Sequence, residues 1–335
     1  MRRILKGMPK KLPIPTQDQE SPYDVIVMGG GASGLMAACA ASAQGKRVLL
    51  LEKNRRLGEK LRISGGGRCN ITNAEEDVRI LLKKYGDAEQ TLYSAFAQFG
   101  IRETFAFFES RGLPLVVEAH KRTFPKTQKA SDVLRVLADA MTKRNVVVKT
   151  SAPVSHIETV DRKIVHVVAG GVSYVAKAYI LATGGMSHPE TGSTGDGFPW
   201  LVALGHTVSA PSPTIVPLST KESWAHALSG SSCEAKVTFF MNQRKAFSVT
   251  GNVLFTHFGL SGPTILNVSS RIADLLQEGN VTVRIDCAPL CNDAELEAHV
   301  LKIFDAGKNK MLKNVFTRIV PGIQVSFLTH LRTID

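Results

Sequence analysis

An apolar strand that leads directly into a glycine-rich turn constrains this chain more than any other feature. Residues 23–28 (Tyr-Asp-Val-Ile-Val-Met) are followed by residues 29–34 (Gly-Gly-Gly-Ala-Ser-Gly), which have Gly-x-Gly-x-x-Gly spacing. A run of mostly small and apolar residues continues from Leu35 to about Gln44. A strand, a glycine turn and a helix in this order form a βα unit whose helix N-terminus faces a phosphate. The pattern therefore predicts a dinucleotide site.

Each glycine of the turn has a separate expected role. Gly29 permits the tight turn, Gly31 lets the backbone approach a pyrophosphate, and Gly34 lets the helix lie close on the strand. The helix amides and dipole then face the phosphates. We assign these residues of the turn to the cofactor: Gly29, Gly31, Ala32, Ser33 and Gly34.

A second apolar strand predicts which dinucleotide is bound. Residues 47–51 (Arg-Val-Leu-Leu-Leu) end in Glu52, about twenty residues past the first glycine of the turn. An acid at this position accepts both hydroxyls of an adenosine ribose, and it disfavours a 2′-phosphate. Glu52 thus favours FAD or NAD over NADP, and we group Lys53 with it as a cofactor-binding residue.

The composition excludes several classes of protein. A chain of 335 residues is long enough for two domains, and no run approaches the eighteen apolar residues that a membrane helix needs. The net charge is +12, but five basic residues lie within the first twelve residues without an acid among them. A basic tail of this kind can contact nucleic acid. Because no helix-turn-helix, RNA-binding or zinc-finger pattern accompanies it, we do not expect a nucleic-acid module.

The N-terminal tail and the cysteines indicate a cytoplasmic protein. The tail lacks the apolar segment of a secretory signal and the serines of a transit peptide. Five cysteines in a chain of this size suit free thiols in a reducing compartment. Cys287 and Cys291 could be half of a metal site or a redox pair, but no second half is visible. We expect two semi-buried thiols there, and no metal.

Further along the chain, the patterns predict four segments: a basic tail (1–22), a nucleotide-binding domain (23–210), an inserted, mostly β domain (211–290) and a helical segment (291–335). Helical patterns occur at 78–84, 92–99, 102–109 and from Ser131, which we predict to be an N-cap. Four short β-rich runs between 146 and 176, separated by residues 161–163 and by Gly170-Gly171, indicate a strand and a small meander. In the inserted domain, a further β-rich run lies at 215–218.

The chain then returns to the sheet through an apolar run, 178–181, that ends in Ala182-Thr183-Gly184-Gly185. An acid on the second strand, a crossover through a β-meander and a later Ala-Thr-Gly together are typical of flavoproteins with two dinucleotide-binding domains. The expected fold class is therefore α/β, with a Rossmann-like FAD-binding domain, a β-meander crossover and an inserted, mostly β domain. In addition to the glycine turn, this pattern assigns further residues to FAD: Val154, Ala182, Thr183, Gly184, Gly185, Asp196 and Gly197.

Three longer motifs carry a more specific resemblance. Residues 58–73 (Gly-Glu-Lys-Leu-Arg-Ile-Ser-Gly-Gly-Gly-Arg-Cys-Asn-Ile-Thr-Asn), 192–197 and 254–263 closely resemble the bacterial flavoprotein family of aminoacetone-oxidase-like and BaiN-like (bile-acid-pathway reductase) proteins. The resemblance runs from about Asp24 to the end of the chain. It implies an FAD-dependent oxidoreductase that uses NAD(P)H.

The glycine loop of the first motif has a physical reason to contact the cofactor. Three consecutive glycines let backbone amides approach an anion or a flavin ring, and two arginines add positive charge beside a diphosphate or N1 of the reduced flavin. Cys69 is either a thiol placed at the flavin or a residue selected for its size. The residues assigned to FAD in this loop are Arg62, Gly65, Gly66, Gly67, Arg68, Cys69 and Asn70.

The third motif contains a candidate catalytic residue. His257 precedes a helix that opens at Gly262-Pro263, and it could protonate or hold a substrate near the flavin. A packed, structural histidine is an equal alternative. Together with Cys69 it completes the set of candidate catalytic residues.

The C-terminal sequence departs from the flavoprotein pattern. Relatives of this type return to the sheet and supply a Gly-Asp loop beside the flavin, whereas residues 309–335 contain no such motif. We therefore expect a chain shortened relative to the family.

Two hypotheses follow. The first is an FAD-dependent oxidoreductase that transfers a hydride between NAD(P)H and a small or hydrophobic organic substrate. The second is a non-catalytic module, with or without flavin, that binds a partner or nucleic acid as one part of a split enzyme. The sequence leaves the oligomeric state open.

Overall fold

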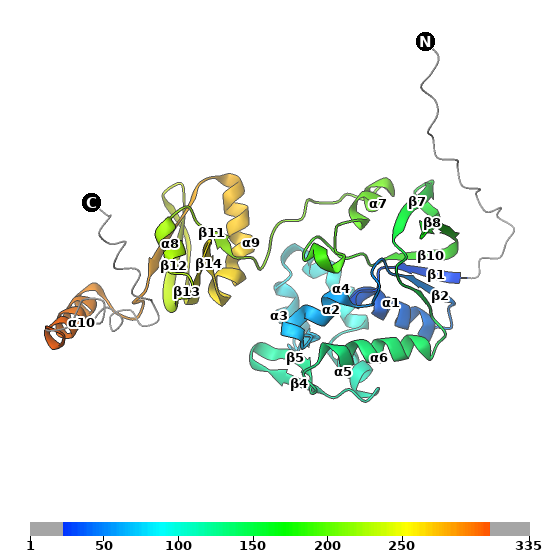
Figure 1. The fold of residues 1–335 in the computed structure, drawn as a ribbon, viewed down its shortest axis with the longest axis horizontal. Coiled ribbons are helices and arrows are strands. Elements are labelled where there is room, and N and C mark those ends of the chain that lie inside the picture. Colours follow the sequence, from blue (N-terminus) through cyan, green and yellow to red (C-terminus); the bar gives the residue numbers. More distant parts are fainter. Residues whose placement is uncertain (1–22, 309–335) are drawn as a thin grey trace, which may run out of the picture. The chain divides into compact units, whose positions relative to one another are not determined.

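The computed structural model describes residues 23–308, and the chain divides between Ser209 and Ala210 into two compact units (Figure 1). The expected basic tail and the segment from residue 309 lie outside the described residues, as does the second helix expected after Asn292. The two units are described separately below.

A four-stranded parallel sheet forms the centre of the first unit. Its order is β10-β1-β2-β6, and all three neighbouring pairs run parallel. The strands are β1 (Tyr23–Met28), β2 (Val48–Leu51), β6 (Val147–Lys149) and β10 (Ala176–Leu181). The last four residues of β1 and all of β2 are buried, as expected for parallel strands that are covered on both faces.

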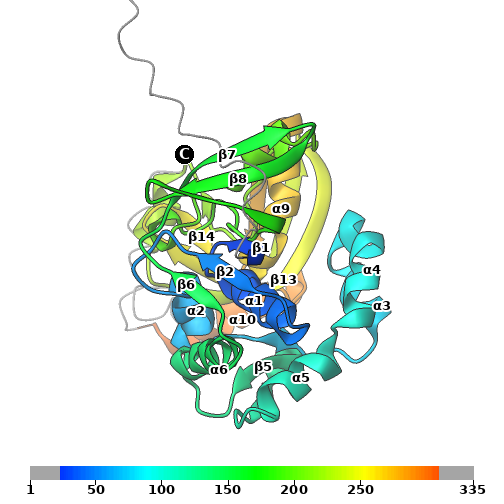
Figure 2. The same cartoon turned by 90° about the vertical axis from the view of Figure 1, so that its right-hand side faces the viewer.

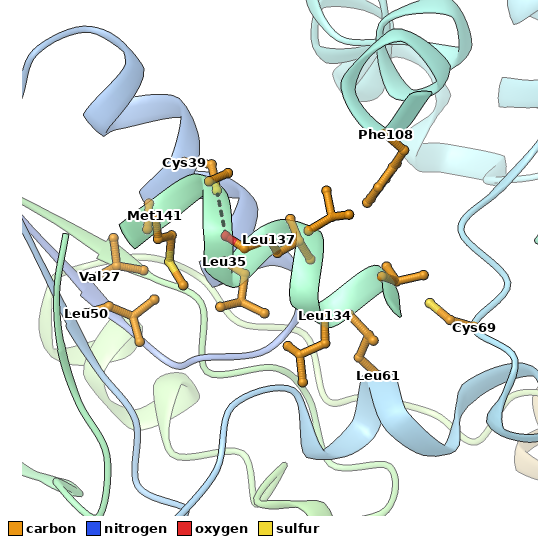
Figure 3. Close-up of a cluster of buried hydrophobic side chains, with 14 of the residues drawn as sticks. Val27, Leu35, Cys39, Leu50, Leu61, Cys69, Phe108, Leu134, Leu137 and Met141 are labelled. Carbon is orange, nitrogen blue, oxygen red and sulfur yellow. Dashed lines mark hydrogen bonds between the residues drawn. The ribbon is translucent and has the colours of Figure 1, made fainter. Parts of the chain in front are cut away.

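Alternation along β1 and β2 divides their side chains between two cores. Val25, Val27, Val48 and Leu50 pack with the helices α1 (Ala32–Ala43) and α6 (Ala130–Thr142), together with Leu35, Leu137 and Met141 (Figure 3). Ile26, Met28, Leu49 and Leu51 point to the opposite face and pack with the meander. The unit therefore has three layers, with the sheet between helices and meander (Figure 2).

The meander consists of β7 (Val154–Val160), β8 (Lys163–Ala169) and β9 (Val172–Tyr174), paired antiparallel in that order. Its turns fall where the sequence predicted them. Gly170 and Gly171 have φ of +57° and +79°, the left-handed region that two-residue hairpin turns need. The predicted Rossmann-like α/β class with a meander crossover is thus confirmed.

Asp24 connects the first residues of β1 to both neighbouring strands. A carboxylate oxygen of Asp24 accepts a hydrogen bond from the Arg47 backbone N–H at 2.9 Å, and the other accepts from Lys177 Nζ at 2.9 Å. Asp24 thereby joins β1 to the residues that begin β2 and to β10. These contacts lower the pKa of Asp24 from 3.8 to about 2, and the hydrogen bond from the Arg47 backbone has the largest effect.

A helical layer and a small sheet separate β2 from β6. The elements in this segment are α2 (Glu59–Ile63), β3 (Thr72–Asn73), α3 (Val78–Lys83), α4 (Glu89–Gln98), α5 (Ile101–Glu109), β4 (Leu115–Glu118) and β5 (Arg122–Pro125). The predicted N-cap at Ser131 was wrong, because α6 already begins at Ala130 and Lys129 has the extended backbone of an N-cap. Ala130 is buried in the core beneath α6, and this packing brings it into the helix.

The second unit is an antiparallel sheet with helices. Its order is β11-β14-β13-β12-β15. The elements are β11 (Leu218–Ser219), α8 (Ser223–Ala227), β12 (Ser232–Met241), β13 (Arg244–Thr256), β14 (Gly259–Ser261), α9 (Pro263–Glu278), β15 (Val281–Asp286) and α10 (Asp293–Ala306). Cys233, Ala235, Val237 and Phe239 alternate with more exposed residues along β12, so one face of the sheet carries the core.

The β-rich run expected at 215–218 forms less strand than predicted. Only its last residue, Leu218, belongs to β11, and Ile215 has φ of +56°. Pro213 and Pro217 lack the N–H that a ladder needs, which explains why the strand begins so late.

Candidate cofactor site

A cavity of about 620 Å³ opens at the carboxyl ends of β1 and β2 in the first unit. This is the size of a cofactor or small-molecule site, and its place is the one where open parallel sheets bind their ligands. Backbone and polar groups of the glycine turn and of Glu52 form one part of its wall. Met36, Ile71, Phe108 and Leu137 form an apolar part between the helices.

The geometry of the turn separates the roles of its glycines. Gly29 has φ of +108°, and a Cβ there would overlap the carbonyl oxygen of Ala182. A Cβ on Gly34 would overlap the carbonyl oxygen of Gly29, so this glycine allows the close approach of α1 to the strand. A Cβ on Gly31 would meet no protein atom within 4 Å. The protein's own packing thus does not require glycine at position 31, which lines the cavity.

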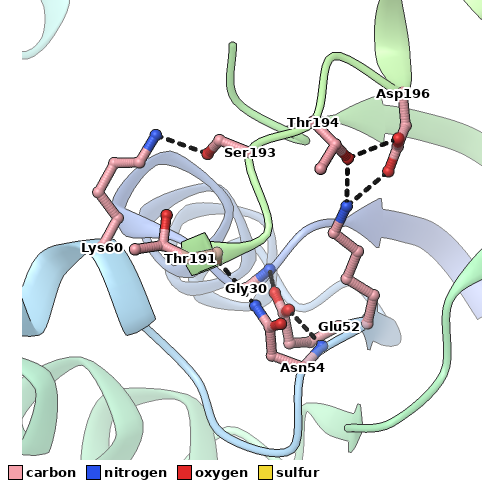
Figure 4. Close-up of polar contacts among 9 residues, drawn as sticks. Gly30, Glu52, Asn54, Lys60, Thr191, Ser193, Thr194 and Asp196 are labelled. Atoms are coloured by element: carbon pink, nitrogen blue, oxygen red, sulfur yellow. Dashed lines mark hydrogen bonds and ion pairs between the residues drawn. The ribbon is translucent and has the colours of Figure 1, made fainter. Parts of the chain in front are cut away.

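Glu52 projects from the end of β2 with both carboxylate oxygens in use. Oε2 accepts a hydrogen bond from the Gly30 backbone N–H at 2.5 Å, and Oε1 accepts from the Asn54 backbone N–H at 2.7 Å (Figure 4). The residue is only 6% exposed, yet it lines the cavity. Each oxygen keeps a second lone pair for a hydroxyl donor. A buried carboxylate fixed by two amides therefore suits a vicinal diol such as a ribose.

Two lysines after Glu52 join the β2–α2 segment to residues 187–196 (Figure 4). Lys53 Nζ lies 2.7 Å from Asp196 Oδ2 and 2.6 Å from Thr194 Oγ1. Lys60 Nζ donates to Ser193 Oγ at 2.6 Å. The Lys53 hydrogen bond lowers the pKa of Asp196, so this carboxylate stays charged at neutral pH. We call these contacts the lysine clasp, which forms part of the cavity wall.

The glycine loop at 64–67 lies outside the wall of this cavity. It forms a tight turn in which Gly65, Gly66 and Gly67 are exposed, with φ of +58°, +68° and +83°. None of the three lines the cavity, although Ser64 on one side and Cys69 on the other do. The positive φ values give a conformational reason for the three glycines.

Arg68 is held by protein groups. Its Nη1 lies 3.0 Å from Glu118 Oε1 and 3.0 Å from Gln128 Oε1, and its guanidinium stacks on the Phe124 ring at 4.0 Å. These contacts fasten the glycine loop to β4 and β5. Arg62 directs its Nε toward the Leu57 carbonyl oxygen at 3.4 Å. Neither arginine lines the cavity.

Cys69 lies in the cavity wall with a left-handed backbone, φ of +63°, and is 5% exposed. Burial raises the pKa of its thiol. Because the thiolate is the nucleophile, a thiol held protonated suits packing better than redox chemistry.

His257 belongs to the second unit, in the turn between β13 and β14, where it is exposed and lies edge-on to the Phe258 ring. Among residues 23–308, no ion pair joins His257 to another side chain.

The cavity brings together most of the residues assigned from the sequence. Those in its wall are Gly29, Gly31, Ala32, Ser33, Glu52, Lys53, Cys69, Asn70, Val154, Ala182, Thr183, Gly184 and Asp196. Those outside it are Gly34, Arg62, Gly65, Gly66, Gly67, Arg68, Gly185, Gly197 and His257. Gly197 packs on the Thr183 side chain, where a Cβ would overlap Oγ1.

Several wall residues were not foreseen: Gly30, Asn54, Lys60 and Ser193. Gly30 contributes its backbone amide, whereas Asn54 contributes its backbone amide to Glu52 and its side-chain amide to the Thr191 carbonyl oxygen at 3.0 Å. Lys60 lies inside the 58–73 motif, between Glu52 and the glycine loop, and this position could have predicted that it lines the cavity.

Two further findings concern residues 23–308. No group of three or more His, Cys, Asp or Glu side chains in this range is placed to hold a metal ion. None of the helices there is both long and apolar enough to span a membrane.

The parallel sheet, the glycine turn and the ribose-type acid define a Rossmann-type nucleotide-binding protein. Residues 23–317 match the model of the HI0933-like protein Rossmann domain. The chain belongs to the HI0933-like family, as the 58–73 motif had indicated.

Characterised relatives cover most of the chain. It is 31% identical to a 3-dehydro-bile acid delta(4,6)-reductase of Clostridium scindens, over 85% of this chain and 68% of that protein. It is 27% identical to the ribosomal RNA dihydrouridine synthases of Haemophilus influenzae and Escherichia coli. These alignments cover 88% and 92% of this chain, and 71% and 74% of the respective synthases.

Solved structures with related folds are more distant. A flavocytochrome c3 fumarate reductase in its open conformation has a TM-score of 0.43 at 18% identity, over 63% of this chain and 46% of that one. The 3-ketosteroid-delta4-(5alpha)-dehydrogenase of Rhodococcus jostii has a TM-score of 0.40 at 19% identity, over 51% and 48%. This chain spans about half the length of each.

Proposed function

We propose that this chain binds FAD in the cavity and transfers a hydride between NAD(P)H and a small or hydrophobic organic substrate. The observation that carries the proposal is that two features lie in one cavity wall: the buried Glu52 carboxylate and Gly31 of the glycine turn. A buried carboxylate with free lone pairs lies beside a glycine that no protein contact requires. An adenosine ribose followed by a diphosphate supplies the groups that would satisfy both positions.

The residues of the cavity would divide the cofactor among them. Glu52 would accept the ribose hydroxyls, and the backbone amides of residues 31–33 at the start of α1 would bind the diphosphate. Val154 would lie along the adenosine, and the Ala182-Thr183 segment would close the opposite wall. These residues would bind and orient the group, and Lys60 of the lysine clasp would add positive charge to the wall, because Lys53 is already paired with Asp196.

The apolar part of the wall supports a hydrophobic substrate or ring system. Met36, Phe108 and Leu137 line the cavity and give one part of it an apolar wall. FAD, when bound, supplies hydride chemistry at its ring, which no side chain of this chain provides. The Clostridium scindens relative is a 3-dehydro-bile acid delta(4,6)-reductase, and a bile acid is an apolar substrate of this kind.

Flavin content and turnover test the proposal together. The purified chain should be yellow, or become so after FAD is added and excess is removed by gel filtration. Oxidation of NADH and NADPH should then be followed with a 3-oxo-steroid diene and, as a control, with a small water-soluble ketone. A chain that stays colourless after incubation with FAD would refute the proposal and favour a flavin-free binding module.

A second candidate function is reduction of a uracil base in RNA. Two relatives are named ribosomal RNA dihydrouridine synthases, and the chain carries a net charge of +12, which favours a polyanionic substrate. Incubation of the FAD-loaded chain with ribosomal RNA and NADPH, followed by nucleoside mass spectrometry, distinguishes the two. Formation of dihydrouridine supports the RNA substrate, and steroid reduction without dihydrouridine supports the small-molecule one.

A further inference from the structure

Two cysteines that are distant in sequence meet in the second unit. Cys233 lies in β12, and Cys287 follows the last residue of β15. Their sulfur atoms are 3.8 Å apart. The sequence suggested Cys287 and Cys291 as the possible pair, but the structure gives Cys287 a different neighbour.

The strand register explains this contact. β12 and β15 are antiparallel, with Lys236 opposite Asp286. Continuing this register by one residue places Cys287 beside Ala235, on the same face as Cys233. Because side chains two residues apart on a strand share a face, both sulfurs point to the core of this unit. The pairing therefore follows from the sheet itself.

The surroundings of the two thiols differ. Cys233 is buried among the core side chains of β12, whereas Cys287 is half-buried at the margin of the same core. Cys291 is exposed, in a turn closed by its N–H and the Ala288 carbonyl oxygen. Cys39, in contrast, directs its sulfur to the Leu137 carbonyl oxygen at 3.6 Å.

We propose that Cys233 and Cys287 are a modification site that forms a reversible disulfide in the presence of a peroxide. The Cys233 sulfur attacks one oxygen of hydrogen peroxide, the O–O bond breaks, and the departing hydroxide takes the thiol proton and leaves as water. The resulting sulfenic acid is attacked by the Cys287 sulfur, the S–O bond breaks, and a second water leaves. Two thiols and one hydrogen peroxide become one disulfide and two waters, with two electrons passing from sulfur to oxygen.

The opposite pKa shifts of the two thiols favour this order of reaction. The hydrogen bond between the two sulfur atoms lowers the pKa of Cys233 and raises the pKa of Cys287. Cys233 is thus the thiol that more readily becomes the attacking thiolate. Cys287, at the open margin of the core, is the sulfur that an external thiol can reach when the bridge is reduced again.

The bridge would act on the edge of the sheet. Within residues 23–308, β15 is an edge strand that pairs with β12. A covalent link at the end of β15 would prevent it from separating, and it would fix the start of the segment that leads to α10. Oxidation would therefore stabilise this unit, with no requirement for bound FAD.

Thiol counting on the full chain tests the proposal. The chain, reduced and desalted, is treated with hydrogen peroxide, denatured and titrated for free thiols. The count should fall from the five cysteines of the sequence to three, and dithiothreitol should restore it. Mass spectrometry of a non-reducing digest should show the Cys233 peptide joined to the Cys287 peptide, with the loss of two hydrogens.

Matched variants separate the possible partners. Cys291→Ser should still lose two thiols, whereas Cys233→Ser should not form the bridge, and only the wild type and Cys291→Ser should gain melting temperature on oxidation. Linkage of Cys287 to Cys291, or oxidation confined to other cysteines, would overturn the proposal. If Cys233→Ser does not fold, the wild-type digest decides alone.

Discussion

Replacement of Glu52 by Gln tests the adenosine end of the cavity. The carboxylate accepts from two backbone amides, and its remaining lone pairs face the cavity. Gln keeps the volume of the side chain but replaces one acceptor oxygen with an NH2 donor. That donor then faces another donor, either a protein N–H or a ribose hydroxyl, and the hydrogen bond is lost. An unsatisfied buried polar group costs about 1–3 kcal/mol. We expect the variant to lose about 2–3 kcal/mol of FAD binding, which is roughly a 30- to 150-fold rise in Kd.

The assay must separate this effect from a loss of stability. The ligand-free variant should also melt earlier, because one of the two backbone amides loses its acceptor. FAD binding is therefore measured by flavin fluorescence at a temperature where circular dichroism shows both proteins folded. Glu75→Gln is the matched control, since Glu75 pairs with Lys121 away from the cavity. A Glu52→Gln protein with a lower melting temperature but a Kd within threefold of the wild type would refute the reasoning.

Three further predictions concern the glycines, the loop arginine and acid stability. Gly66→Ala should keep normal FAD content, and its free energy of unfolding should fall by about 1–2 kcal/mol because of the positive φ alone. Gly29→Ala should instead lose FAD, and equal flavin absorbance in the two variants would contradict this prediction. Arg68→Ala should lower the free energy of unfolding by about 1–2 kcal/mol, from an ion pair and a ring contact, with flavin retained, as urea titration would show. Asp24 has a folded pKa below its unfolded value, so its stabilisation is present above about pH 4 and is lost as the pH falls toward about 2. Asp24→Asn should remove that part of the acid dependence of the melting temperature, and an unchanged profile would assign it to other groups.

The sequence predicted the fold well where local patterns decide it. The buried runs at 23–28 and 48–51, the helix after the glycine turn and the meander all follow from periodicity and turn residues, and each is present. The strand expected at 215–218 shows the limit of such patterns, because prolines override apolar content.

The candidate site was predictable only in part, since some of its contacts join distant segments. Arg68 was expected beside the cofactor on the basis of charge and of neighbouring glycines. Its partner Glu118 lies 50 residues away in β4, and no spacing rule indicates such a pair. The lysine clasp likewise joins Lys53 to Asp196 across 143 residues. The sequence shows which side chains are charged, but only the fold shows which charged side chains form ion pairs with one another.

The position of β10 beside β1 has a consequence for synthesis of the chain. Asp24 and Lys177, which tie these strands, are 153 residues apart. At roughly 5–20 residues per second, a ribosome needs about 8–30 s to make the intervening segment. During that interval β1 has one edge without its neighbour, next to an already complete glycine turn. Nascent chains of this protein therefore expose an apolar strand edge for many seconds, and chaperone binding in that window should improve the yield of native protein.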